Sequence, residues 1–118
     1  MIQRPMSEQA FLVLTVLAAA GPKHGYAIMQ AAEALNANQP ALPVATLYGL
    51  LDRLVADELV EVDREEIHRG RLRRYYRVTP AGLGALAAEA DRVAANVRAA
   101  RRALRSTRPH TSPSGGVV

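Results

Sequence analysis

The chain of 118 residues has no cysteine and no tryptophan, and only 4% of its residues are aromatic. The absence of cysteine excludes disulfide bonds, thiolate catalysis and cysteine-ligated zinc or iron–sulfur sites. A reducing compartment is therefore permitted, and we expect a cytoplasmic protein. Hydrophobic residues still make up 49% of the sequence. The core must therefore consist of leucine, valine and alanine in closely packed helices.

Long apolar runs are also missing. The stretch from Phe11 to Ala20 is too short to span a bilayer, which takes about 20 residues. It stops at Gly21-Pro22 without the layout of a secretory signal. We therefore expect no membrane partner.

The charge is unbalanced in sign and in residue type. The formal net charge is +4, and 14 of the 15 basic residues are arginine. No acidic residue follows Asp91. Because arginine suits bidentate contacts with phosphate and guanine, polyanions are the natural partners.

Capping residues and apolar spacing predict three helices before residue 58. The first runs from Glu8 to Ala20 after the N-cap Ser7, the second from about His24 to Asn36, and the third from Pro43, in its first turn, to about Asp57. A loop is expected at 36–40. The expected inward-facing residues are Phe11, Leu12, Leu14, Val16, Leu17, Tyr26, Ile28, Met29, Leu35, Leu47, Leu50, Leu51, Leu54 and Val55.

The opposite face of the third helix is small and polar. A helix in this position enters a DNA groove in winged helix-turn-helix proteins, although an ordinary solvated face has the same pattern. The residues on this face are Ala45, Thr46, Tyr48, Gly49, Asp52 and Arg53.

The segment 64–79 carries six arginines in a strand, turn, strand pattern. Val60 and Val62 alternate with Glu61 and Asp63, and Tyr76 and Val78 alternate with Tyr75 and Arg77. The sequence His68-Arg69-Gly70-Arg71 supplies the turn, with Gly70 free to take a positive φ. The hairpin would project Arg69, Arg71, Arg73 and Arg74 toward a phosphate backbone. A charge run of this kind is otherwise a solvated surface.

A final helix is predicted after the N-cap Thr79, with Pro80 at its first position and about 25 residues of length. Its apolar residues recur every three or four positions, as in a coiled-coil seam. The helix is too long for the rest of the domain to cover, so a second subunit is expected, with packing on its own domain as the alternative. The seam consists of Leu83, Leu86, Ala90, Val93, Val97, Ala100 and Leu104.

Catalytic and metal sites are not indicated. The three histidines, His24, His68 and His110, have no metal-ligand spacing, and His24 is better explained as a helix-start residue. No nucleophile is paired with a base. We expect no enzyme activity, no metal and no bound cofactor.

Three runs together resemble the PadR family of bacterial transcriptional regulators: GPKHGYAIMQ at 21–30, ATLYGLLDRLVADELV at 45–60 and GRLRRYYRVTPAG at 70–82. The resemblance covers roughly residues 7–105. It implies a mainly α fold with a small β-hairpin: a winged helix-turn-helix domain at 1–78 and a dimerisation helix at 79–105. It also implies repression relieved by a small molecule. The segment 106–118 is rich in proline, serine, glycine and threonine, so we expect a disordered tail there.

The chain departs from the family pattern at several positions. Gly49 and Leu72 stand where prolines are frequent, and Glu58 stands where a glycine commonly ends the third helix. The tryptophan on which relatives stack flat aromatic ligands is missing, so the ligand class does not carry over.

We therefore expect a homodimer that binds a palindromic operator in double-stranded DNA. Thr46, Tyr48 and Gly49 would lie at the major groove, while Arg53 binds backbone or pairs with a neighbouring acid. The arginines of the hairpin and Tyr75 would reach flanking phosphates or the minor groove. The family architecture implies an effector cavity between the first helix and its dimer partner, lined by Phe11 and Leu12. The alternative is a winged-helix module that binds proteins without touching DNA.

Overall fold

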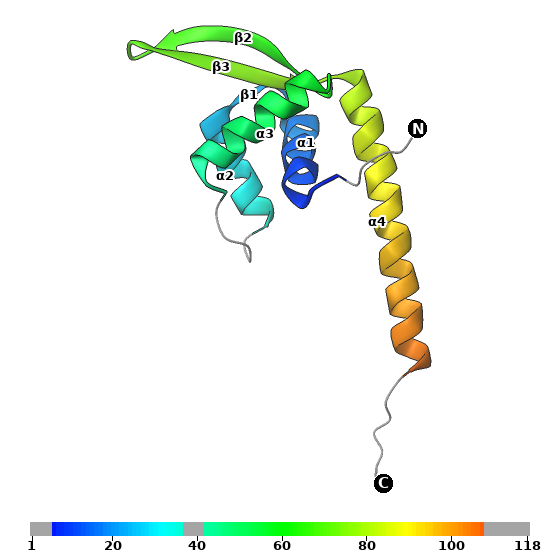
Figure 1. Cartoon of the computed structure of the whole chain (residues 1–118). Coiled ribbons are helices and arrows are strands. Elements are labelled where there is room, and N and C mark those ends of the chain that lie inside the picture. Colours follow the sequence, from blue (N-terminus) through cyan, green and yellow to red (C-terminus); the bar gives the residue numbers. More distant parts are fainter. Residues whose placement is uncertain (1–5, 37–41, 108–118) are drawn as a thin grey trace.

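The computed structural model describes residues 6–36 and 42–107. Three helices form a compact body, a long hairpin lies across it, and the last helix extends away from it (Figure 1). The elements are α1 (Glu8–Ala20), β1 (Lys23–His24), α2 (Gly25–Leu35), α3 (Val44–Ala56), β2 (Val60–His68), β3 (Arg71–Val78) and α4 (Pro80–Ser106). The mainly α fold with a β-hairpin is confirmed.

The N-termini of α1, α2 and α4 are each closed by a side chain. Ser7, His24 and Thr79 accept the backbone N–H three residues further on, at 3.1, 3.3 and 2.9 Å. Such caps satisfy one of the amide groups that a helix leaves unpaired at its start. The predicted caps Ser7 and Thr79 and the helix-start role of His24 are confirmed.

The ends of α3 differ slightly from the prediction. Pro43 is the N-cap rather than a residue of the first turn, and no side chain caps this helix. At the other end Glu58 takes a φ of 63°. Its N–H donates to the carbonyl of Val55, and the next N–H donates to the carbonyl of Leu54. This is the hydrogen-bond pattern of a Schellman motif, in which glycine usually holds the left-handed position.

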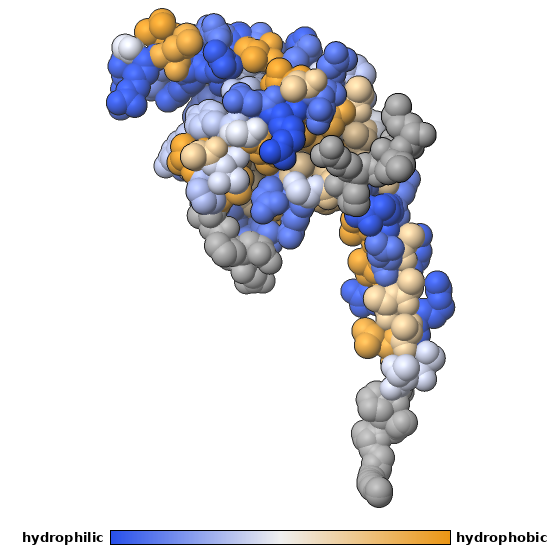
Figure 2. Space-filling view, viewed as in Figure 1, coloured by the Kyte–Doolittle hydropathy of each residue, from blue (hydrophilic) through white to orange (hydrophobic). Residues whose placement is uncertain are grey.

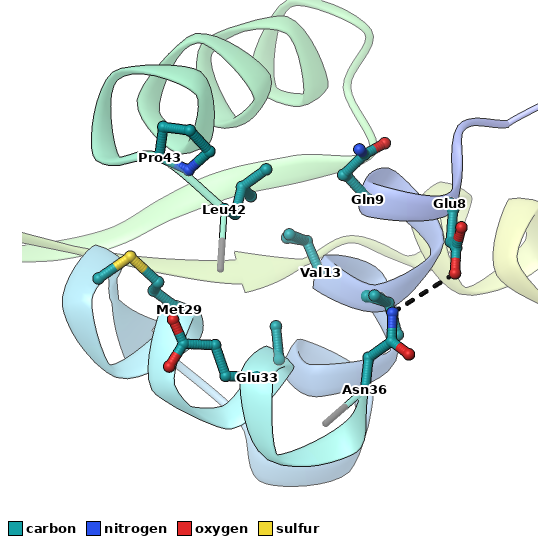
Figure 3. A pocket seen from close by; sticks show the side chains of 10 residues that line it. Glu8, Gln9, Val13, Met29, Glu33, Asn36, Leu42 and Pro43 are labelled. Carbon is teal, nitrogen blue, oxygen red and sulfur yellow. Dashed lines mark hydrogen bonds between the residues drawn. The ribbon is translucent and has the colours of Figure 1, made fainter. Parts of the chain in front are cut away.

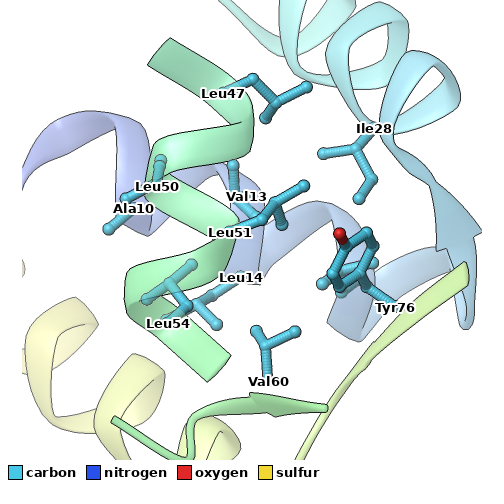
Figure 4. Close-up of a cluster of buried hydrophobic side chains, with 11 residues drawn as sticks. Ala10, Val13, Leu14, Ile28, Leu47, Leu50, Leu51, Leu54, Val60 and Tyr76 are labelled. Carbon is cyan, nitrogen blue, oxygen red and sulfur yellow. The ribbon is translucent and has the colours of Figure 1, made fainter. Parts of the chain in front are cut away.

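One apolar core joins α1, α2, α3 and the hairpin. Leu14 and Leu51 are completely buried, and Tyr76 covers the core from the sheet (Figure 4). Four residues expected to face inward are not part of this core: Tyr26 and Leu35 are 58% and 57% exposed, and Phe11 and Leu12 are only half-buried. The buried cluster consists of Ala10, Val13, Leu14, Leu17, Ile28, Leu47, Leu50, Leu51, Leu54, Val60 and Tyr76.

The sheet has three antiparallel strands in the order β1-β3-β2 within the described residues. The short strand β1 pairs with Tyr75 and Tyr76, and it was not predicted. Val60 and Val62 lie opposite Val78 and Tyr76, as the alternation predicts. A bulge at Asp63 then shifts the register of β2 by one residue.

Helix α4 is joined to the body only over its first turns. Gly82 is buried against the backbone carbonyl of Leu59, which leaves no room for a side chain there, and Leu86 packs against the core. The helix ends at Ser106 rather than Leu104 or Arg105, with Thr107 as its C-cap. The remainder of the expected tail, and most of the expected loop at 36–40, lie outside the described residues.

Candidate nucleic-acid interface

The outer face of α3 is exposed, as its polar pattern predicts. Thr46, Gly49 and Arg53 are accessible, and nothing lies within 4 Å of the position that a Cβ on Gly49 would take. Arg53 forms no ion pair with a described residue. Of its two expected roles, pairing with a neighbouring acid is therefore not observed, and binding to a phosphate backbone stays a prediction. A helix with this open face and small side chains can approach the edges of bases closely.

Tyr48 is held in place by the neighbouring helix. A Cβ built on Gly25 would lie 2.5 Å from Tyr48 Oη and 2.7 Å from Cζ, so the ring rests directly on the start of α2. The side chain is still 43% exposed. The Gly25 and Tyr48 motifs of the sequence therefore meet in one contact, which fixes α3 against α2 and leaves the tyrosine facing solvent.

The hairpin turns through two residues. Arg69 and Gly70 have φ values of 53° and 78°, between the paired residues His68 and Arg71. Positive φ at both central positions is typical of a type I′ turn, whose twist matches that of the strands. The expected positive φ of Gly70 is confirmed, and Arg69 shares it. The turn places the Arg69 side chain at the tip of the wing, by which we mean residues 64–74.

Half of the hairpin arginines are neutralised by acids on β2. Arg74 Nε lies 2.9 Å from Glu65, and Arg77 Nε lies 2.7 Å from Glu61. Arg64 Nε lies 2.7 Å from Glu66 Oε2, and this hydrogen bond is the main reason that the pKa of the Glu66 carboxyl is lowered. Exposed pairs of this kind contribute little stability, but they cancel positive charge on the surface of the hairpin.

The bulge at Asp63 determines the pair between Arg74 and Glu65. It brings Arg64 opposite Tyr75 and Glu65 opposite Arg74. Without the extra residue, Arg64 would lie opposite Arg74, and like charges directly across a ladder repel. Because the sequence does not reveal the bulge, it did not predict which acid pairs with which arginine.

Three wing arginines keep their charge available. Arg69, Arg71 and Arg73 form no ion pair with any residue in the described part of the chain. Arg73 lies opposite Glu66, whose hydrogen bond goes to Arg64 instead. The positive surface of the wing is therefore concentrated toward its tip.

The two adjacent tyrosines point to opposite faces of β3, as expected. Tyr76 is buried, whereas Tyr75 is half-buried between two other side chains. The Arg64 guanidinium lies 3.9 Å from the centre of the Tyr75 ring, a cation–π contact. The His24 ring meets Tyr75 edge-on at 5.4 Å. Burial and the neighbouring positive charge of Arg73 lower the pKa of His24, which keeps its capping nitrogen unprotonated.

Two large apolar side chains are exposed near the tip of the wing. Ile67 and Leu72 are 72% and 57% exposed and lie directly opposite each other in the ladder. The wing in Figure 2 shows apolar surface at its end, surrounded by hydrophilic residues. The departure at Leu72 was visible in the sequence, but its pairing with Ile67 was not.

A hollow of about 710 Å³ separates the wing from the starts of α2 and α3. Tyr26, Tyr48 and Asp52 line its helical side, and Arg71, Leu72, Arg73 and Arg74 line its wing side. Tyr48 and Asp52 of α3 and the wing arginines therefore border one concave surface, whereas Thr46, Gly49 and Arg53 do not line it. Of the predicted site residues, Tyr48, Arg69, Arg71, Arg73 and Arg74 are brought together there.

The predicted dimerisation seam of α4 is uncovered in the single chain beyond Leu86. Val93, Val97 and Leu104 are 37%, 44% and 69% exposed, and Leu83 is 48% exposed. Figure 2 shows apolar surface along the projecting helix. None of the described helices has the length and apolar character needed to cross a membrane, and no three metal-ligating side chains converge within the described residues.

A helix-turn-helix followed by an arginine-bearing β-hairpin defines the winged-helix class of proteins. The sequence profile described as the transcriptional regulator PadR-like family matches residues 13–88. The chain belongs to this family, and it is a transcriptional regulator. No curated protein matches the sequence.

Solved structures have the same fold. A PadR family transcription regulator from Clostridium difficile matches with a TM-score of 0.62 at 19% identity, over 86% of this chain and 98% of that one. A PadR-like transcriptional regulator from Bacillus cereus matches with a TM-score of 0.66 at 19% identity, over 80% and 89%. A PadR family regulator from Eggerthella lenta matches at 25% identity with a TM-score of 0.57, over 87% and 86%.

Proposed function

We propose that the protein is a homodimeric repressor that binds a palindromic operator in double-stranded DNA and responds to a small molecule. The observation that carries the DNA-binding part is the concave surface between α3 and the wing. It combines an exposed helix face with arginines that have no ion pair among the described residues. A phosphate backbone supplies the negative charges that would balance these arginines.

The two halves of this surface have different tasks. Thr46 and Tyr48 on α3 contact base edges in the major groove, where each base pair has a distinct pattern of donors and acceptors. Arg69, Arg71 and Arg73 contact phosphates and supply affinity that depends on salt. Ile67 and Leu72 lie against sugar edges of the minor groove, where apolar side chains can be accommodated.

A second subunit covers the exposed seam of α4. The 27-residue helix is about 40 Å long at 1.5 Å per residue, and most of it extends beyond the body. Large apolar residues exposed in a row mark an interaction surface. Two-fold symmetry places two α3 helices on successive major grooves, so the half-sites lie about one helical turn apart.

The experiment is to recover genomic DNA bound by the purified protein and to sequence it. We expect enrichment of a palindrome, and its loss in the Thr46→Ala/Tyr48→Ala variant with general DNA affinity partly retained. If no sequence is enriched with the wild type, the chain is a protein-binding winged helix and the proposal is wrong.

A further inference from the structure

A cavity of about 340 Å³ opens between α1, the end of α2 and the residues that lead into α3. Figure 3 shows Val13, Met29 and Leu42 around it, each from a different part of the chain. Val13 is 1% exposed and belongs to the core, and Met29 and Leu42 pack against that core. None of the lining residues belongs to the hairpin, so the proposed DNA contacts leave this cavity unused.

The polar lining of the cavity is negative. Glu8 and Glu33, both exposed, are the charged residues among the described residues that line it, and none of those described residues is cationic. Asn36 Nδ2 donates to Glu8 Oε2 at 3.4 Å, which holds one carboxylate at the rim (Figure 3). Neither carboxylate forms an ion pair with another described residue. In a protein with a net charge of +4, this local excess of negative charge favours a cation.

The size and walls of the cavity define the rest of the ligand. Its volume equals that of about eleven water molecules at roughly 30 Å³ each, which is at the small end of ligand pockets. The apolar floor offers no polar partners to a bare ion. We propose that the cavity binds a small organic cation with an apolar body, and that its binding weakens DNA binding. The claim that ligand binding weakens DNA binding rests on the proposed function.

The coupling runs through the start of α3. Leu42 and Pro43 line the cavity and lead directly into the helix. The Pro43 carbonyl accepts the N–H of Leu47 at 2.9 Å, but no side chain caps this end. Packing of Leu42 therefore positions the first turn, which carries Thr46. A ligand that displaces Leu42 moves this turn, and by linkage DNA must weaken ligand binding by the same factor.

Binding is tested on the full chain without DNA, by calorimetry with three probes of one shape: 4-phenylbutylammonium, 4-phenylbutan-1-ol and 4-phenylbutanoate. We expect the ammonium probe to bind about tenfold more tightly than the alcohol, because it faces two carboxylates. The Glu8→Gln/Glu33→Gln variant should lose this preference. Asp91→Asn, which removes an exposed carboxylate on α4, is the matched control and should bind as the wild type does.

A filled cavity provides the second variant. Ala32→Leu adds bulk to the wall, and it should abolish binding of the ammonium probe while circular dichroism shows unchanged helix content. Equal binding of the three probes, or unchanged binding by a folded Ala32→Leu protein, would overturn the site. Failure of the variant to fold would leave the Glu8→Gln/Glu33→Gln comparison to decide.

The coupling is tested separately on the recovered operator. The ammonium probe should raise the dissociation constant for DNA in the wild type but not in Glu8→Gln/Glu33→Gln. If the probe binds and the DNA affinity stays constant, the site is retained and the coupling is refuted. Since the calorimetric arm contains no DNA, it fails or succeeds independently of the proposed repressor function.

Discussion

The hairpin offers a comparison of two pairs of arginines that differ in whether acids neutralise them. Arg71 and Arg73 have no ion pair among the described residues, whereas Arg74 and Arg77 bind Glu65 and Glu61. Replacing either pair by alanine removes the same two formal charges from each chain. The structure predicts that only the first replacement removes phosphate contacts.

The expected size of the effect follows from counterion release. Each phosphate contact contributes about 0.9 to the slope of log K against log salt concentration on B-DNA. Arg71→Ala/Arg73→Ala removes two contacts from each subunit, so the slope of a dimer should flatten by about 3.6. Arg74→Ala/Arg77→Ala should change it by less than about one, because those arginines already have carboxylate partners.

The assay is fluorescence anisotropy of a labelled operator duplex across a salt titration, with thermal unfolding as the control for folding. Equal flattening of the slope by the two variants would refute the reasoning, since it would mean that the ion pairs do not withhold their arginines from DNA. An unchanged slope with Arg71→Ala/Arg73→Ala would reject the wing as the phosphate-binding element.

Three further predictions concern stability and assembly. Glu58→Gly should raise the free energy of unfolding by about 1 kcal/mol, because glycine relieves the left-handed backbone of the Schellman motif; thermal unfolding measures it, with Glu58→Ala as the charge-matched control. The free energy of unfolding should fall as the pH drops from the ordinary His24 pKa of 6.5 through its lowered folded pKa, because the unfolded chain binds the proton more readily. His24→Asn, a cap that does not titrate, should flatten this dependence in urea titrations at several pH values. Val93→Asp/Val97→Asp should reduce the mass in sedimentation experiments to the 12.7 kDa of one chain.

Each of these has a contradicting result. Equal stabilisation by Glu58→Gly and Glu58→Ala would assign the gain to lost charge rather than to the backbone. A parallel pH profile for His24→Asn would mean that other groups control the acid limb. An unchanged dimer mass for Val93→Asp/Val97→Asp would place the subunit contact away from the outer part of α4.

Helices were predictable because their signals are local. Ser7 and Thr79 each cap a helix through an amide three residues away, and the leucines of α3 repeat at helical spacing. Burial depends on the rest of the fold instead. Tyr26 and Leu35 are apolar residues on a helix with one buried face, and their exposure could not be read from the pattern.

The candidate site was predictable in its residue types but not in its electrostatics. The arginines and the turn at Gly70 were evident, whereas the partner of each arginine depends on strand register. One extra residue at Asp63 shifts that register and decides that Arg74 rather than Arg73 is neutralised. The cavity beside Leu42 arises from segments distant in sequence and lies within one chain. Of the two residues expected to line an effector cavity at the dimer partner, Leu12 lines this cavity and Phe11 does not.

The central claim is that two chains, joined through α4, bind one palindromic operator. Sedimentation equilibrium of the protein with a single recovered duplex measures the number of chains on the DNA directly. The structure predicts two chains on a full palindrome, with affinity falling steeply when the half-sites are moved apart by half a helical turn. One chain on each duplex, with affinity independent of the spacing, would contradict it.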